Sequence, residues 1–228
     1  MLLKEWNKLP ASMQTPEVRK YYDELRRKPL DLFLKRLFDI VVSITLIHLL
    51  WIPMVFIALW IKHDSKGPVF FRQIRITTGG KEFKIFKFRT MVVDAEKLGT
   101  QVTAYQDPRI TKSGRFLRKF RLDELPQLFN VLTGDMSFVG TRPEVPRYVE
   151  AYTPEMWATL LMPAGITSEA SIQYKDEDRL LEGAKDPDKV YVEQILPEKM
   201  KYNLNYIRKF HFINDLAIMI KTVLAVVK

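Results

Sequence analysis

The sequence contains no cysteine and only three histidines among its 228 residues. Disulfides, thiolate metal sites and cysteine nucleophiles are therefore excluded, and neither a histidine-based metal site nor a catalytic triad is expected. The motifs G-x-G-x-x-G, H-E-x-x-H and G-x-S-x-G and the EF-hand loop are also missing. Any chemistry of this chain must therefore come from its carboxylates and its cations.

The charge is strongly one-sided, with a formal net charge of +9 and a pI near 9.6. Such a balance indicates anionic partners, namely nucleic acid, phosphorylated small molecules or acidic lipid headgroups. Residue types AVILMFWYC make up 47% of the chain, which is enough for a core. The length is typical of one domain with appendages.

The first 32 residues are polar and basic, and they lack the apolar stretch of a cleavable signal peptide. We expect a basic arm here, solvated or carrying a surface helix over residues 17–28. No repeat or low-complexity tract follows it.

Residues 40–61 form the longest apolar run, long enough as a helix to reach across a hydrocarbon core of about 30 Å. Pro53 lies near its middle and favours a kink or break. Both flanks are basic, and the positive-inside rule would place both on the cytoplasmic side. The sequence therefore favours a re-entrant helix, broken at Pro53, over a simple span.

Two alternating segments, residues 69–76 and 82–88, flank a Gly-containing turn and predict a β-hairpin. The second strand is expected to carry Lys84 and Lys87 on its polar face, with Arg89 just beyond. Residues 212–227 are strongly apolar but short for a span, which favours a core helix or one in the membrane interface.

The centre of the sequence is the segment 115–136, in which Asp123 and Glu124 follow several cations. Apolar residues recur after them at helical spacing, and Gly134 supplies a stop, so a helix is predicted to begin at Asp123. One interpretation is that Asp123 only caps this helix. The other is that nearby cations and the helix N-terminus keep Asp123 ionised, as a nucleophile or metal ligand.

Cations and carboxylates together are what phosphoryl chemistry requires, because cations or Mg²⁺ neutralise phosphate oxygens while a carboxylate attacks phosphorus or binds the metal. The candidate residues for such a site are Lys87, Arg89, Arg118, Asp123, Glu124, Asp135 and Arg142.

Several ordered blocks of this sequence resemble the bacterial sugar transferases, the monotopic phosphoglycosyl transferases, from about Phe33 to the C-terminus. The blocks are Lys35-Arg36-x-x-Asp39, Ser65-Lys-Gly-Pro-Val-Phe-Phe-Arg-Gln73, Lys87-Phe-Arg-Thr-Met91, Asp107-Pro-Arg-Ile-Thr111, Leu122-Asp-Glu-Leu-Pro-Gln127, Gly134-Asp-Met-Ser-Phe-Val-Gly140 and Arg142-Pro143.

The resemblance implies transfer of a sugar 1-phosphate from a UDP-sugar to undecaprenyl phosphate or another polyprenyl phosphate, with release of UMP. It implies an aspartyl-phosphosugar intermediate and Mg²⁺ as cofactor. The enzyme would begin a bacterial glycan (O-antigen, capsule, exopolysaccharide or glycoprotein) at the inner membrane, in contact with phospholipid, with its catalytic domain on the cytoplasmic face. A homo-oligomer is compatible with this, and no nucleic-acid partner is expected.

Carried over position by position, the resemblance makes Asp123 the nucleophile and a Mg²⁺ contact, with Glu124 assisting the lipid phosphate or the metal. Lys87, Arg118 and Arg142 would hold phosphate oxygens. Arg89 is a further phosphate-binding candidate. Asp135 and Gln127 are additional candidates.

Three stretches depart from the family pattern. Ile52-Pro53 stands where Ser-Pro is frequent, and Thr141-Arg142-Pro143 replaces the commoner Pro-Arg-Pro. Residues 169–178 differ from the Trp-Ala-Gln-Val-Asn-Gly-Arg-like stretch of many relatives, which leaves the nucleotide and sugar contacts open.

The predicted fold is α/β and mainly helical, with a small β-hairpin, one re-entrant membrane helix and interfacial amphipathic helices. The expected division is a basic arm over 1–32, the membrane helix over 33–64 and the catalytic domain over 65–228. Two other functions compete with catalysis: a membrane-tethered basic protein that binds nucleic acid or acidic lipid, and an inactive relative that serves as a scaffold.

Overall fold

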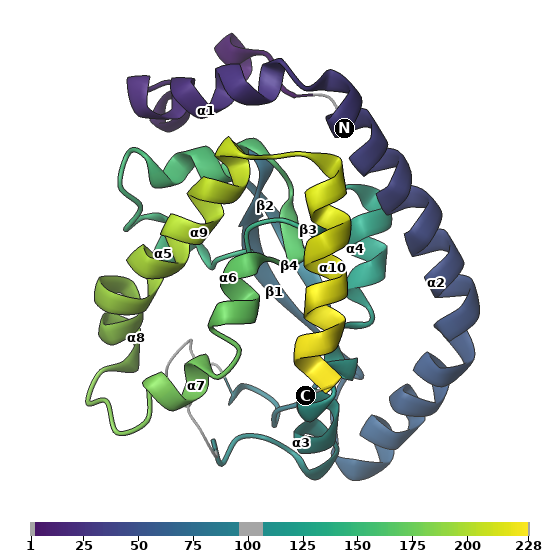
Figure 1. Cartoon of the computed structure of the whole chain (residues 1–228). Coiled ribbons are helices and arrows are strands. Elements are labelled where there is room, and N and C mark those ends of the chain that lie inside the picture. The colour runs from purple at the N-terminus through teal and green to yellow at the C-terminus, as the bar shows by residue number, and fades with distance from the viewer. Residues whose placement is uncertain (1–2, 96–106, 228) are drawn as a thin grey trace.

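The computed structural model describes residues 3–95 and 107–227, except for the side chains of Asp178, Val226 and Val227. Figure 1 shows a mainly helical chain with two small sheets at its centre. The elements in chain order are η1 (Trp6–Lys8), η2 (Ala11–Met13), α1 (Pro16–Arg26), α2 (Pro29–Asp64), β1 (Phe70–Thr77), η3 (Thr78–Gly80), β2 (Lys81–Phe88), α3 (Lys112–Lys119), η5 (Leu122–Glu124), α4 (Gln127–Thr133), β3 (Met136–Val139), α5 (Pro146–Val149), η6 (Met156–Leu161), β4 (Ala164–Thr167), α6 (Glu169–Gln173), α7 (Glu177–Leu180), α8 (Pro187–Val190), the π-helix η7 (Tyr191–Ile195), α9 (Leu196–Arg208) and α10 (Phe212–Val227).

The long helix α2 arcs around one side of the molecule (Figure 1). Among the described residues it is the one helix long and apolar enough to cross a membrane, and only 11% of its most apolar window is buried. It continues through Pro53, so of the kink or break expected there the break is not present, and Figure 1 shows the helix curved rather than straight. Proline removes only one helical hydrogen bond, and the turns on either side can continue the helix around it.

Both ends of α2 are tied to the rest of the fold. At its start, Asp31 accepts a hydrogen bond from the Phe212 backbone N–H of α10 (2.9 Å). At its end, Asp64 accepts from both the backbone N–H (3.0 Å) and the hydroxyl (2.8 Å) of Ser113 in α3. The two ends of the apolar helix therefore meet the same folded body.

A buried polar cluster fixes the first half of α2, and we call Lys35, Asp39 and Asp215 the anchor cluster. The Lys35 ammonium donates to Asp215 (2.5 Å) and to the Val139 carbonyl (2.7 Å). Asp39 accepts from the Ser137 hydroxyl (3.0 Å) and the Phe138 N–H (3.2 Å). The Lys35-Arg36-x-x-Asp39 motif thus joins α2 to β3 and α10.

The predicted β-hairpin is confirmed by the antiparallel pairing of β1 with β2. Its register places Lys87 opposite Phe71 and Lys84 opposite Ile74. Because successive side chains alternate between the two faces of a strand, Lys84 and Lys87 point to opposite faces, which corrects the single polar face expected from the sequence. Lys84 is exposed, whereas Lys87 points inward.

A second, parallel pair of strands, β3 and β4, was not predicted, because these segments look like Gly/Pro-containing loops in the sequence. The two glycines at the junction make the pairing possible. A Cβ atom on Gly165 would lie 2.2 Å from the backbone nitrogen of Gly140, so any side chain there would collide with the neighbouring chain. The parallel sheet places the segment carrying Arg142 next to the hairpin.

The N-terminal segment is a surface helix whose inner side is buried. Val18 and Leu25 of α1 are fully buried against α9 and η6 residues that include Met200 and Leu161. Thr15 caps the helix by accepting from the Val18 N–H. The segment therefore forms part of the main hydrophobic core, and a freely solvated arm is ruled out.

Candidate active site

A cleft of about 1670 Å³ opens along the inner face of the hairpin and contains the two adjacent carboxylates. Asp123 and Glu124 belong to the short 3-10 turn η5, and both are buried. Arg121, just before this turn, has a left-handed backbone (φ 56°), which is strained for a residue other than glycine. That reversal links α3, with Arg118 near its end, to the carboxylates.

The Glu124 carboxylate forms ion pairs with two cations that lie in separate parts of the fold. Lys87 of β2 donates to its Oε1 at 2.8 Å, and Arg142 donates to the same oxygen at 3.2 Å. Burial acts to raise the pKa of Glu124, but the charges of Lys87 and Arg142 outweigh it and hold that pKa well below the usual value. The charge of Glu124 in turn raises the pKa of Arg142. Glu124 is therefore an ionised, immobilised carboxylate.

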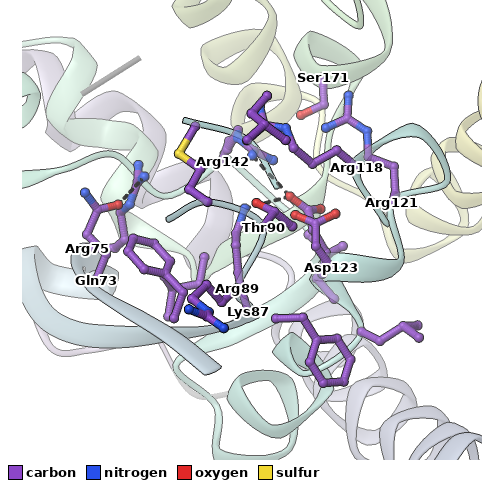
Figure 2. A pocket seen from close by; sticks show the side chains of 18 of the residues that line it. Gln73, Arg75, Lys87, Arg89, Thr90, Arg118, Arg121, Asp123, Arg142 and Ser171 are labelled. Carbon is purple, nitrogen blue, oxygen red and sulfur yellow. Dashed lines mark hydrogen bonds and ion pairs between the residues drawn. The ribbon is translucent and has the colours of Figure 1, made fainter. Parts of the chain in front are cut away.

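Asp123 is in a different state from its neighbour. Its Oδ1 is buried and has no hydrogen-bond partner in the described part of the chain. Burial raises the pKa of Asp123, Glu124 adds to the rise, and Lys87 and Arg118 oppose it. Figure 2 shows the side chain pointing into the cleft beside Lys87 and Thr90, with Arg118 and Arg121 on its other side. We call Lys87, Asp123, Glu124 and Arg142 the cleft cluster.

The capping interpretation of Asp123 is wrong. Helix α4 begins only at Gln127, its N-cap is Pro126, and neither α4 nor η5 has a side-chain capping bond. The expected helix start at Asp123 is displaced because Leu122 to Glu124 form a separate 3-10 turn. The predicted stop is confirmed: Gly134 ends α4 in the left-handed conformation (φ 90°).

The structure brings four of the candidate residues around the carboxylates to the same cleft and places the other two, Asp135 and Gln127, elsewhere. Lys87, Arg118 and Arg142 line the cleft beside Asp123. Arg89 borders the cleft too, but its guanidinium donates to the carbonyls of Ser65 and Lys66 and so ties down the end of α2. Asp135 lies outside this cleft and pairs with Lys81 (3.0 Å). Gln127 is buried in α4 and its amide nitrogen lacks a partner in the described part of the chain.

Two sets of cleft residues were missed from the sequence. Arg121 lies two positions before Asp123 and lines the cleft, and the run of cations upstream was the signal for it. Gln73 and Arg75 share the face of the hairpin that carries Lys87. Whether residues of two strands share a face depends on how the strands pair, and the alternation of residues within one strand does not reveal that pairing.

A divalent cation fits this site through few protein ligands. Among the described residues no group of three or more histidines or carboxylates converges. Mg²⁺ is commonly held by one or two carboxylates together with substrate phosphates, and the unpartnered Oδ1 of Asp123 is a suitable ligand. Asp123 and Glu124 are thus the residues able to hold it.

Comparison with known proteins gives matches over most of the chain. The sequence model of the family described as bacterial sugar transferase matches residues 30–228. A UDP-N-acetylgalactosamine-undecaprenyl-phosphate N-acetylgalactosaminephosphotransferase of Aeromonas hydrophila is 36% identical over 199 residues, covering 86% of this chain and 44% of that protein. A UDP-glucose:undecaprenyl-phosphate glucose-1-phosphate transferase of Escherichia coli (strain K12) is 41% identical over 196 residues, covering 83% of this chain and 39% of that protein.

An uncharacterized sugar transferase of Bacillus subtilis (strain 168), EpsL, is 39% identical over 141 residues, covering 62% of this chain and 69% of that protein. The matched region thus spans less than half the length of the Aeromonas and Escherichia relatives.

Proposed function

Because the chain belongs to the bacterial sugar transferase family, we propose that it transfers a sugar 1-phosphate from a UDP-sugar to undecaprenyl phosphate and releases UMP. The relatives named for undecaprenyl-phosphate transfer supply the substrate classes. The observation that carries the proposal is the buried, unpartnered carboxylate oxygen of Asp123 beside cations that Glu124 does not fully neutralise. A fold does not keep such a group for stability, since an unmade hydrogen bond costs about 1–3 kcal/mol.

The proposed reaction has two displacements at one phosphorus. A carboxylate oxygen of Asp123 attacks the β-phosphorus of the UDP-sugar. The bond between that phosphorus and the oxygen bridging the two phosphates breaks, and UMP leaves with the bridging oxygen. An oxygen of undecaprenyl phosphate then attacks the same phosphorus, and the bond to Asp123 breaks to restore the carboxylate. The lipid keeps the sugar phosphate as a diphosphate, and no oxidant or reductant is needed.

The neighbouring residues have separate tasks. The side chains of Arg118 and Arg121 have no hydrogen-bond or ion-pair partner within residues 3–95 and 107–227, so their guanidinium groups are available to phosphate oxygens. Lys87 and Arg142 hold Glu124 in place and lend positive charge to the transition state. Mg²⁺, held by Asp123 with Glu124 nearby, would neutralise charge on the diphosphate.

The membrane arrangement is part of the same proposal. The exposed apolar residues of α2 and α10 include Phe56, Leu59, Ile220 and Val223, each more than 60% exposed. Such surfaces are stable when lipid covers them. Both ends of α2 contact one folded body, which supports a helix that enters and leaves on the same side of a bilayer rather than a straight crossing. The basic flanks support the cytoplasmic side.

The deciding experiment uses the full chain in nanodiscs with Mg²⁺, undecaprenyl phosphate and a panel of UDP-sugars, and it measures UMP. We expect UMP release that requires the lipid phosphate and that Asp123→Asn abolishes. Acid quenching with a UDP-sugar labelled in the β-phosphate, before lipid is added, should leave label on the protein in a peptide containing Asp123. Release of UMP by a folded Asp123→Asn protein would remove the nucleophile assignment. Silence of the wild-type protein across the panel would favour a scaffold or a binding protein.

A further inference from the structure

The cleft continues past the carboxylates along the inner face of the hairpin. Lys87 lies opposite Phe71, and Gln73 and Arg75 follow on the same face at two-residue steps. Each two-residue step advances about 7 Å, so Arg75 lies roughly 13 Å along the strand from the level of Lys87. Figure 2 shows Gln73 and Arg75 on the opposite side of Lys87 from Asp123. This length is comparable with that of a nucleoside diphosphate.

The far end of the cleft, which we call the distal lobe, is lined by Gln73, Arg75, Glu144, Glu177, Tyr191 and Lys199. Four of its polar groups, Glu144, Glu177, Tyr191 and Lys199, form one network. Lys199 donates to Glu177 (2.6 Å) and to the Tyr191 hydroxyl (3.1 Å), and that hydroxyl donates to Glu144 (2.6 Å). The two cations and the two carboxylates balance in this lobe, whereas cations predominate around Asp123.

Two features indicate that the distal lobe has a function beyond packing. Tyr191 begins a π-helix, a rare conformation that is frequent at functional sites. Arg75 donates to the Pro143 carbonyl (3.0 Å) and to Oε1 of Gln73 (2.6 Å), but its buried Nε has no partner among the described residues. The reaction proposed above uses none of these groups.

We propose that the distal lobe binds the nucleoside of the donor, so that UMP leaves along the hairpin away from Asp123. This inference rests on the proposed function. In phosphoryl transfer the attacking and leaving oxygens lie roughly in line across phosphorus. The group opposite Asp123 is therefore the leaving UMP, whereas the sugar oxygen lies to the side. A charge-balanced lobe suits an uncharged nucleoside, and the cation-rich end suits phosphates.

The contacts can be assigned within the lobe. Glu144 and Glu177 both act electrostatically on Arg142, and Glu144 already accepts from the Tyr191 hydroxyl, so we assign the Glu177 carboxylate to the ribose hydroxyls. Gln73 and Arg75 lie farther along and present amide and guanidinium donors to the carbonyl oxygens of the base. The buried Lys199, which donates to both Tyr191 and Glu177, positions Glu177.

The test measures inhibition of nanodisc-held enzyme by UMP, 2′-deoxy-UMP and CMP. Glu177→Gln should raise the inhibition constant of UMP about tenfold and remove the preference for UMP over 2′-deoxy-UMP. Gln73→Leu should reduce the discrimination between UMP and CMP. In both variants the KM for the UDP-sugar should rise in parallel while kcat changes less than about threefold. Glu193→Gln, an exposed residue paired with Lys189 outside the cleft, is the matched control.

The alternatives give different results. Variants that change which UDP-sugar is preferred, with UMP inhibition unchanged, would assign the lobe to the sugar and overturn the proposal. Unchanged inhibition and unchanged KM in variants that melt like the wild type would leave the network purely structural, and would also overturn it. If the wild type releases no UMP, the proposed function fails. Calorimetric binding of UMP to the wild type and to Glu177→Gln then still shows whether the distal lobe binds the nucleoside.

Discussion

The anchor cluster and the cleft cluster are both buried groups that contain a lysine and carboxylates, yet they differ in how fully their polar atoms are hydrogen-bonded. In the anchor cluster, Lys35, Asp39 and Asp215 all have hydrogen-bond partners, including backbone groups of β3. In the cleft cluster, Glu124 is satisfied and Asp123 keeps an unpartnered oxygen. Burial of charge is therefore common to both clusters, and the incomplete hydrogen bonding of Asp123 is what distinguishes the cleft cluster.

The first and largest expected effect concerns Asp123, the member of the cleft cluster whose hydrogen bonding is incomplete. Asp123→Asn should lower the rate of UMP release by roughly 10⁴-fold or more, because the proposed nucleophile is lost. The apparent Tm at neutral pH should rise, since the raised pKa means that ionised Asp123 destabilises the fold. This gain should shrink as pH falls and Asp123 becomes protonated. A fall in Tm at neutral pH would show that the carboxylate is structural; Asp23→Asn on α1 is the control.

A substitution in the anchor cluster, whose members all have hydrogen-bond partners, should have the opposite effect: it should lower stability and leave the catalytic rate unchanged. Lys35→Met leaves Asp215 and Asp39 buried without their cation, which should cost about 3–5 kcal/mol and lower the apparent Tm strongly. The rate per folded molecule should stay close to that of the wild type, because the cluster does not reach the cleft. Lys62→Met, at the exposed far end of α2, serves as the control. Equal loss of rate and stability in a folded Lys35→Met protein would erase the contrast between the clusters.

The third comparison uses two lysines of one strand. Lys87→Gln should lower kcat/KM by about 10²–10³-fold, because it removes a charge beside Asp123, whereas Lys84→Gln on the outer face should not. Asp123 must be ionised to attack, so activity is lost as pH falls through its pKa. Burial already places this pKa above the ordinary value, and loss of Lys87 should move the acid limb to higher pH. A pH–rate profile of both variants checks this.

The smallest expected effect concerns Glu124 and stability. Glu124→Gln should cost about 2 kcal/mol at neutral pH, because Lys87 and Arg142 lose their ionised partner. The folded pKa of Glu124 is lowered, so its stabilising contribution is complete above the unfolded pKa and is lost as pH falls toward the folded one. The Tm difference from wild type should therefore be constant near neutral pH and shrink in acid. If the Tm difference between Glu124→Gln and the wild type did not depend on pH, the loss of stability would come from packing and not from the lost ion pairs.

Much of the fold could be predicted from local pattern. Alternation predicted the hairpin, and the long apolar run together with the terminal run 212–227 predicted α2 and α10. The parallel strands were missed, because four-residue strands with glycines look like loops until they pair. Pro53 predicted a kink or break, and the helix is not broken there, since the turns around it continue.

The sequence alone determined which residues could do chemistry: without cysteine and with few histidines, only carboxylates and cations remained, and the Asp123-Glu124 pair stood out among them. Tertiary structure alone decided which contacts they make. Strand register separated Lys87 from Lys84, and packing gave Arg89 to the end of α2 and Asp135 to Lys81. Whether a carboxylate is satisfied depends on donors far away in the chain, so only the fold could leave Asp123 unpartnered while completing Glu124.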